Sequence, residues 1–356
     1  MNIEILFIIP VLLSFFVSYA LTPLVIRLAW KFDLIDDPEK NKHEKVIHKK
    51  KTPRAGGLAI FLSIIVSILF LFKIDQHLIG IILGLVVLVI VGILDDKYNL
   101  NPYLRILLLL IATSMPIVSG IGIAFINNPI TGQLVDLSYP RFNFTLLGQE
   151  RSFWILSDLF AFFWIFTLMN FINWGAKGVD GQLSGVMFIA SLTIAILSLR
   201  FSADVTEWPV SVLASITAGA FLGFLPYHKY PQKIMPGFSG STIGGYMLGV
   251  LSILTTTKVG ILAIVLAVPL IDSGYTVIRR LLQGKSPVWG DRGHLHHRLL
   301  DKAGLTKPQI AYFYWIATAV LGGIALFLNS EFKLYTIIGL VFLIGGLILW
   351  LTYRPK

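Results

Sequence analysis

Two neighbouring carboxylates, Asp95 and Asp96, stand in the segment GILDDKYN at the end of a long apolar run. Adjacent carboxylates close to a membrane repel each other, so they usually need a cation to hold them. A hard divalent ion such as Mg²⁺ binds oxygen ligands and bridges to substrate phosphates. The pair therefore predicts a metal-assisted site for a phosphorylated substrate. A solvated helix end with Lys97 as counter-ion is the structural alternative, although carboxylates oppose the dipole at a helix C-terminus.

A second polar cluster lies in the segment NFINWGAKGVDGQLSG. Asn170 and Asn173 are three residues apart, so a helix places them on one face. A glycine-rich turn then presents Lys177 and Asp180. Two buried amides could hydrogen-bond a sugar or a nucleobase, and Asp180 could join a metal site. Hydrogen bonding between helices is the alternative for the amide pair.

Basic residues gather before the second apolar run, in HKKKTPRAGG. Three lysines, Lys49 among them, and Arg54 could hold a phosphate, and the pair Gly56-Gly57 lets backbone amides approach an anion. The alternative is a basic anchor at the membrane surface followed by a tight turn.

Another glycine-rich segment, PGFSGSTIGGYMLG, leads into an apolar run through Gly237, Gly240 and Ser241. A helix N-terminus of this kind suits anion binding. The later glycines have the spacing of close helix packing, which is the alternative explanation.

Histidines cluster in GDRGHLHHRLLDKAG, residues 290–304. A helix would place His294, His297 and Asp301 on one face, with His296 pointing elsewhere. Neutral imidazoles could bind a metal, and protonated imidazoles could pair with phosphate, as could Arg292. Three histidines within four positions favour a functional site over isolated structural roles.

Helices spanning a membrane must position these clusters. Of the 356 residues, 56% are hydrophobic and 13% are charged, whereas a soluble domain carries about 25% charge. The apolar runs are continuous, which excludes an outer-membrane β-barrel. No cysteine is present, so disulfides, thiolate catalysis and Cys-ligated zinc are excluded. We expect an all-α integral membrane protein with a single domain, 1–356.

About 20 apolar residues cross a bilayer. By this measure the sequence predicts eleven transmembrane helices: 4–30, 56–73, 77–94, 103–126, 152–173, 183–200, 208–226, 241–257, 259–278, 310–328 and 334–352.

The distribution of Lys and Arg predicts the orientation of these spans. Most of the basic residues fall in one set of loops, which we place in the cytoplasm, with the N-terminus outside and the C-terminus inside. The same loops carry every polar cluster described above: 31–55, 95–105, 174–182, 227–240 and 279–309. The net charge of +10 therefore reflects orientation and anion binding, and nucleic acid is not an expected partner. Turn signals in 127–151 predict a small β-hairpin or interfacial loop outside.

The ordered set of motifs resembles the polyprenyl-phosphate N-acetylhexosamine-1-phosphate transferase superfamily, which includes the undecaprenyl-phosphate GlcNAc-1-phosphate transferases and the phospho-MurNAc-pentapeptide translocase. The resemblance runs from about Asp36 to Leu300. The segments IAFINNPITGQLVDL and SPVWGDRGHLHHRLL favour the GlcNAc-1-phosphate branch. The residues that carry the likeness are Thr52-Pro53-Arg54-x-Gly56-Gly57, Asp95-Asp96, Asn170-x-x-Asn173 with Asp180-Gly181, and Asp291-Arg292-x-His294-Leu295-His296-His297.

The resemblance implies transfer of an N-acetylhexosamine 1-phosphate from a UDP-sugar to undecaprenyl phosphate, with release of UMP, in the cytoplasmic (inner) membrane. It implies Mg²⁺, with Mn²⁺ as the alternative cation, and leaves a homodimer open. We expect catalytic roles for Asp95, Asp96, Asp180 and His297, with the three aspartates holding the metal. We expect substrate binding by Lys49, Arg54, Asn170, Asn173, Lys177, Arg292, His294 and His296.

Two departures from the family pattern affect the metal. The family has Gly-Asp-x-Gly-Ser where this chain has GFSGS, so Phe238 stands at the position of a principal magnesium ligand. Lys177 stands where the family has an aspartate, one residue further on, and could supply positive charge in place of the metal. A catalytically altered homologue that binds the lipid phosphate or nucleotide sugar is therefore one alternative. A membrane transporter is the alternative from another class.

Overall fold

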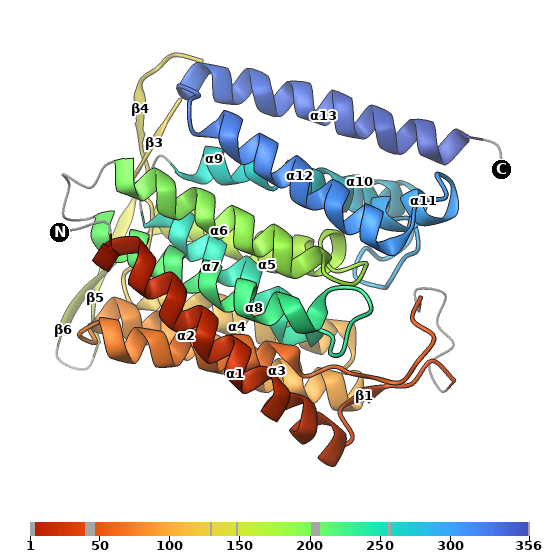
Figure 1. Cartoon of the computed structure of the whole chain (residues 1–356). Coiled ribbons are helices and arrows are strands. Elements are labelled where there is room, and N and C mark those ends of the chain that lie inside the picture. Colours follow the sequence, from red (N-terminus) through yellow and green to blue (C-terminus); the bar gives the residue numbers. More distant parts are fainter. Residues whose placement is uncertain are drawn as a thin grey trace.

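The computed structural model describes residues 4–39, 47–128, 130–146, 149–200, 207–254 and 258–354. Most of these residues lie in helices that form one bundle (Figure 1). The strands that follow α4 (Pro102–Val118) in the chain lie at one end of the bundle, beside the start of α1 (Ile9–Lys31), whereas α11 (Leu295–Asp301) and the end of α13 (Ser330–Tyr353) lie at the other end (Figure 1). The expectation of a mainly helical chain is confirmed.

The chain begins with a π-helical turn, Glu4–Ile8, that continues into the first α-helix. The remaining helices follow in chain order, and the strands form three antiparallel pairs. The helices are α1 (Ile9–Lys31), α2 (Gly56–Leu71), α3 (Gln76–Tyr98), α4 (Pro102–Val118), α5 (Ile155–Gly175), α6 (Gln182–Arg200), α7 (Trp208–His228), α8 (Gly237–Ile253), α9 (Lys258–Val265), α10 (Ala267–Leu282), α11, α12 (Lys307–Ala325) and α13 (Ser330–Tyr353).

Apolar helices make this a multi-pass membrane protein. Six helices in the described part of the chain are long and apolar enough to cross a bilayer, or seven spans if α9 and α10 count as one. The six are Ile5–Lys31, Gln76–Tyr98, Ile155–Gly175, Gln182–Arg200, Trp208–His228 and Ser330–Tyr353. Each of the eleven predicted spans contains a helix, but α2 and α4 are shorter apolar helices, so the number of crossings stays a prediction.

Two predicted spans differ from the observed helices. The predicted helix 259–278 is broken, because α9 and α10 meet at an angle of 83°. Pro269 lies in the first turn of α10, where its missing N–H removes no helical hydrogen bond. A helix can therefore start there, whereas a helix that continued straight from α9 would lose a hydrogen bond at this position. The predicted helix 103–126 ends at Val118, and Gly120 follows with a φ of 98°.

The predicted hairpin region forms two antiparallel pairs rather than one. β3 (Phe125–Asn127) pairs with β4 (Leu134–Asp136), and β5 (Arg141–Leu146) pairs with β6 (Gln149–Trp154). Both pairs lie at the end of the bundle opposite α11 (Figure 1). Residues 129, 147 and 148 of this region lie outside the described residues.

The central helix α8 is buried along its whole length, between α3, α5 and α2. Its glycines allow these neighbours to approach. A Cβ on Gly245 would lie 2.6 Å from the backbone oxygen of Leu168, and one on Gly249 would lie 3.1 Å from Ile165. Close helix packing therefore explains the later glycines of this segment.

The helix termini next to α11 bring the polar clusters together. Asn99 adopts a left-handed conformation with a φ of 47° and ends α3, so Asp95 and Asp96 lie in its last turn. α5 ends at Gly175 just before Lys177, and α8 begins at Gly237. A two-residue pair of β1 (Ile35–Asp36) and β2 (Thr52–Pro53) leads into α2. We call this end of the bundle the motif end.

Candidate active site

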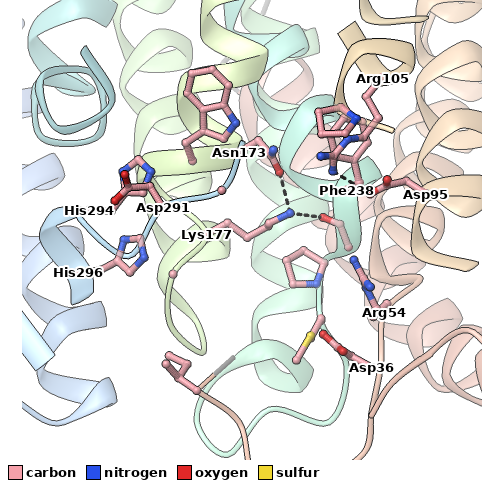
Figure 2. A pocket seen from close by; sticks show the side chains of 18 of the residues that line it. Asp36, Arg54, Asp95, Arg105, Asn173, Lys177, Phe238, Asp291, His294 and His296 are labelled. Atoms are coloured by element: carbon pink, nitrogen blue, oxygen red, sulfur yellow. Dashed lines mark hydrogen bonds and ion pairs between the residues drawn. The ribbon is translucent and has the colours of Figure 1, made fainter. Parts of the chain in front are cut away.

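A cavity of about 840 Å³ opens at the motif end. Figure 2 shows its wall, with Asp95, Arg105 and Phe238 on one side and His294 and His296 on the other. Four predicted site residues, Lys49, Asp96, Asn170 and Arg292, do not line it. The other eight do: Arg54, Asp95, Asn173, Lys177, Asp180, His294, His296 and His297.

The carboxylate pair is buried, and each member has an arginine partner. Asp95 lies 3.4 Å from the Nη1 atom of Arg105, and Asp96 lies 3.3 Å from the Nε atom of Arg54. The side chain of Asp96 has no exposed surface, whereas Asp95 lines the cavity. The Oδ1 atom of Asp95 and the Oδ2 atom of Asp96 have no hydrogen-bond partner among the described residues. Unpaired buried oxygens are costly, so they indicate a site that a bound ligand or a proton completes.

Asp96 also occupies the N-terminus of α8. The backbone N–H of Phe238 donates to its Oδ1 atom at 3.2 Å. Gly237 precedes it with a φ of 69°, and a Cβ there would lie 2.1 Å from the Oδ2 atom of Asp96. The anion at this helix N-terminus is therefore a carboxylate of the protein itself, held by the backbone and the helix dipole.

Phe238 contributes an aromatic face instead of an oxygen ligand. Its ring is buried, and the guanidinium carbon of Arg105 lies 5.4 Å from the ring centroid. This cation–π contact holds Arg105 beside Asp95. Figure 2 shows Phe238 and Arg105 together on this wall.

Lys177 reaches from the α5–α6 turn toward the start of α8. Its ammonium donates to the Oδ1 atom of Asn173 at 2.6 Å and to the backbone oxygen of Gly237 at 3.3 Å (Figure 2). Ser241 donates to the same Asn173 oxygen at 2.7 Å. Asn173 thus joins two helices and positions the lysine.

Four charged groups act on Lys177. Burial lowers the pKa of Lys177 to about 8, although the charges of Asp96 and Asp95 favour its protonated form. Arg54 and Arg105 favour the neutral form. An anionic ligand placed among these groups would favour the protonated lysine.

Asp180 lines the cavity but is held separately from the carboxylate pair. Its Oδ2 atom accepts from the backbone N–H of Gln232 at 3.2 Å, and its Oδ1 atom lies 3.5 Å from the ammonium of Lys307. Gln182 stabilises the preceding turn by accepting from the N–H groups of Gly178 and Val179. The turn is therefore held by hydrogen bonds between its backbone and the side chain of Gln182.

The histidine cluster is assembled by a buried aspartate. The Nδ1 atom of His294 lies 3.0 Å from Asp272, which also accepts from the backbone N–H of Leu295. The ring of His296 stacks on His294 with centroids 5.7 Å apart, and the ring of His297 lies 4.3 Å from that of His296. Asp272 is fully buried, so it fixes the orientation of His294.

The predicted helical face of this cluster is wrong. α11 begins at Leu295, and His294 is its N-cap with a ψ of 152°. The helical spacing rule therefore does not connect His294 to the residues that follow. His296 does not point away, because it lines the cavity with the other two histidines. Asp301 instead forms an ion pair with Arg292.

Two arginines of α10 hold the segment before the histidines. Arg279 and Arg280 each lie 2.8 Å from a different oxygen of Asp291. Partial burial raises the pKa of Asp291, but the hydrogen bonds from these arginines outweigh it and hold the pKa well below its usual range. Arg292 turns to Asp301 at 2.9 Å, outside the cavity wall.

The basic segment before α2 divides between the cavity and the surface. Arg54 lines the cavity and also donates to Asn99 at 3.1 Å, whereas Lys49 is exposed. A Cβ on Gly56 would lie 2.5 Å from the backbone oxygen of Met235, and one on Gly57 would lie 2.3 Å from the backbone nitrogen of Gly240. The glycine pair therefore serves close packing.

Asn170 lies away from the cavity and donates to the backbone oxygen of Phe166 at 2.9 Å. The sequence reasoning also missed three charged residues of the site. Arg105 pairs with Asp95, Asp272 orients His294, and Lys307 pairs with Asp180. Asp272 could have been found from the sequence, because it is a lone carboxylate within an apolar run, and such a carboxylate usually has a partner.

The donor set does not fit the predicted divalent cation well. The described residues contain no group of three His, Asp or Glu side chains that could hold a metal ion. Asp95, Asp96 and Asp180 each lie beside a basic side chain, and Phe238 supplies no oxygen. The two remaining carboxylate oxygens lie among three cations, which would repel Mg²⁺. The dependence on Mg²⁺ or Mn²⁺ stays a prediction.

Comparison with known proteins identifies relatives over most of the chain. The family model described as Glycosyl transferase family 4 matches residues 78–256. A relative named probable undecaprenyl-phosphate N-acetylglucosaminyl 1-phosphate transferase, from Bacillus subtilis (strain 168), is 30% identical and covers 83% of this chain and 78% of its own.

Two further relatives extend the comparison. A decaprenyl-phosphate N-acetylglucosaminephosphotransferase of Mycolicibacterium smegmatis is 28% identical, over 86% of this chain and 78% of its own. A phospho-N-acetylmuramoyl-pentapeptide-transferase of Orientia tsutsugamushi is 27% identical, over 89% of this chain and 91% of its own. The names of these relatives agree with the superfamily that the sequence motifs resemble.

Proposed function

The chain belongs to glycosyl transferase family 4, and we propose that it transfers N-acetylglucosamine 1-phosphate from UDP-N-acetylglucosamine to a polyprenyl phosphate such as undecaprenyl phosphate. An oxygen of the lipid phosphate attacks the β-phosphorus of the nucleotide sugar. The bond from that phosphorus to the bridging oxygen breaks, and UMP leaves with the bond electrons. The product is a lipid-linked pyrophosphate sugar, a starting unit for envelope glycans.

One observation of the site supports this proposal above all. A buried carboxylate, Asp95, and three basic side chains, Arg54, Arg105 and Lys177, line one wall of a cavity of about 840 Å³. Phosphoryl transfer requires mainly positioning and stabilisation of negative charge. The basic side chains serve the phosphates, and the unpartnered oxygen of Asp95 serves to orient or deprotonate the lipid phosphate.

The histidine wall suits the rest of the donor. His294, His296 and His297 line the cavity, and His294 and His296 lie on the side opposite Asp95 (Figure 2). Asn173, Trp174 and the backbone of the α5–α6 turn supply further polar and aromatic surface. We assign this part of the cavity to the sugar and the nucleoside.

The topology follows from the charge distribution. We propose eleven spans in the cytoplasmic membrane, with the N-terminus outside and the motif end in the cytoplasm, where the nucleotide sugar is made. The loops of the motif end carry most of the Lys and Arg residues. The lipid phosphate reaches the site from the bilayer, since the cavity lies at helix termini.

The oligomeric state of the protein, for which a homodimer is one option, is not needed for this chemistry.

The test is a reconstitution assay. Purified protein in nanodiscs receives labelled UDP-GlcNAc and undecaprenyl phosphate, in Mg²⁺ and separately in EDTA, and UMP release is measured. We expect release in at least one condition, and Asp95→Asn should lower it about 100-fold or more. Asp75→Asn is the matched control, because Asp75 caps the opposite end of α3 and asparagine is an equally good cap. No UMP release in any condition refutes the proposal.

A catalytically altered homologue is the second candidate, favoured by Phe238 in place of an acidic residue. It would bind UDP-GlcNAc without releasing UMP, so the same assay separates the two. A transporter is not favoured, because transporters bind their substrates near the bilayer midplane. Here the charged cavity lies at helix termini, and the buried Asp272 serves His294.

A further inference from the structure

Lys177 is a cation built into the cavity. Its ammonium is held by two neutral oxygens, those of Asn173 and Gly237, so these contacts do not neutralise its charge. An ammonium has three N–H donors, and these contacts use two. The third is available to a ligand in the cavity that Lys177 lines.

Arg54 and Arg105 add two positive charges to the same wall. Each is ion-paired with a carboxylate at 3.3–3.4 Å, a separation that is longer than a good charge-assisted hydrogen bond. Three cations thus oppose the two carboxylates Asp95 and Asp96, so these five side chains together carry one net positive charge. Asp36 also lines the cavity, near Arg54 (Figure 2). The net positive charge of the five side chains is the electrostatic condition for binding an anion without an added metal ion.

Phe238 fixes this arrangement. Its ring holds the guanidinium of Arg105, at 5.4 Å, and its backbone N–H holds Asp96. The start of α8 therefore positions one cation and one carboxylate, while Phe238 offers no carboxylate oxygen for a metal ion. The same helix start accepts from Lys177 through the backbone oxygen of Gly237.

We propose that Lys177, together with Arg54 and Arg105, binds the diphosphate of the nucleotide sugar directly, so that substrate binding needs no divalent cation. The identity of the ligand rests on the proposed function. Lysine acts as a point charge toward phosphate, and arginine offers a fork of donors to two phosphate oxygens. The three side chains replace the charge that a metal ion would supply in neutralising the diphosphate.

The test measures the affinity of the full-length protein in nanodiscs for UDP-GlcNAc by calorimetry, in excess EDTA and in Mg²⁺. We expect the two dissociation constants to agree within about threefold, which is a small difference in free energy. Lys177→Met should weaken binding about 10- to 100-fold, the cost of one charged hydrogen bond, and Mg²⁺ should not restore it.

Lys97→Met is the matched control. Lys97 is exposed near the same end of α3, with its ammonium over the ring of Tyr98 at 5.6 Å, and it does not line the cavity. Its replacement should leave the dissociation constant within about twofold, since an exposed charge is screened by solvent. The comparison of EDTA with Mg²⁺ uses the unmodified protein, so it decides the question even if a variant does not fold.

The outcomes separate this inference from the proposed function. Binding that EDTA abolishes and Mg²⁺ restores overturns the inference, as does a folded Lys177→Met variant with unchanged affinity. Binding in EDTA without UMP release in any condition supports the inference and refutes the transfer reaction. UMP release that requires Mg²⁺ for substrate binding supports the reaction and overturns the inference. Absence of UDP-GlcNAc binding in both conditions overturns both.

Discussion

Replacing Gly237 with alanine should disable the site by displacing Asp96. The new Cβ would lie 2.1 Å from the Oδ2 atom of Asp96 and 2.3 Å from the backbone oxygen of Arg54, whereas real Cβ atoms essentially never come closer than 3.0 Å. The carboxylate must therefore move by about 1 Å, a shift that can cost about 100-fold in rate. The φ of 69° adds about 1–2 kcal/mol of backbone strain.

The measurement is kcat/KM for UMP release, together with thermal unfolding in nanodiscs. Gly304→Ala is the matched control, because Gly304 has a φ of 71° but nothing within 4 Å of its Cβ position. It bears the same backbone strain without the steric conflict, so it should lower stability but keep turnover within about twofold. The reasoning is refuted if folded Gly237→Ala retains wild-type turnover, or if both variants lose turnover equally.

Three further predictions concern the cavity wall. Because the pKa of Lys177 is lowered to about 8, kcat/KM should fall as pH rises through this value and the ammonium loses its proton. Lys177→Arg, which stays charged, should abolish that alkaline limb, and a pH profile unchanged in this variant would contradict the assignment. Gly178→Ala should weaken UDP-GlcNAc binding about tenfold or more, because the new Cβ would lie 2.0 Å from the ring of His296 and displace it. If calorimetry finds an unchanged affinity, His296 does not bind the donor. Asp272→Asn should lower kcat/KM about 10- to 100-fold, because the new amide can donate to the Nδ1 atom of His294 and so favour the tautomer that carries its proton on Nε2. The pH–rate profile should shift as well. An unchanged profile would limit Asp272 to a packing role.

Local features of the sequence determined the class of the protein and the position of its helices. Continuous apolar runs predict spanning helices because the bilayer leaves the backbone no other partner, and each predicted run contains a helix. The turn signals of 127–151 predicted a small β-hairpin or interfacial loop, since Asn, Gly and Pro restrict the backbone locally, and this region forms two pairs of strands. Residue types also marked most of the cavity wall, because charged side chains in an apolar chain are concentrated where they function.

Only the tertiary structure decided which of these residues act together. Asp96 meets Phe238 across 142 positions, and His294 meets Asp272 across 22, and no periodicity encodes such contacts. The structure turned Arg292 toward Asp301 and brought Arg105 to the carboxylate pair. Long-range ion pairs depend on how the helices pack against each other, and this packing depends on where each helix ends or bends. The 83° bend between α9 and α10 is one example. The sequence by itself thus determined the membrane helices and the kinds of groups at their ends, while packing decided which cation faces which carboxylate.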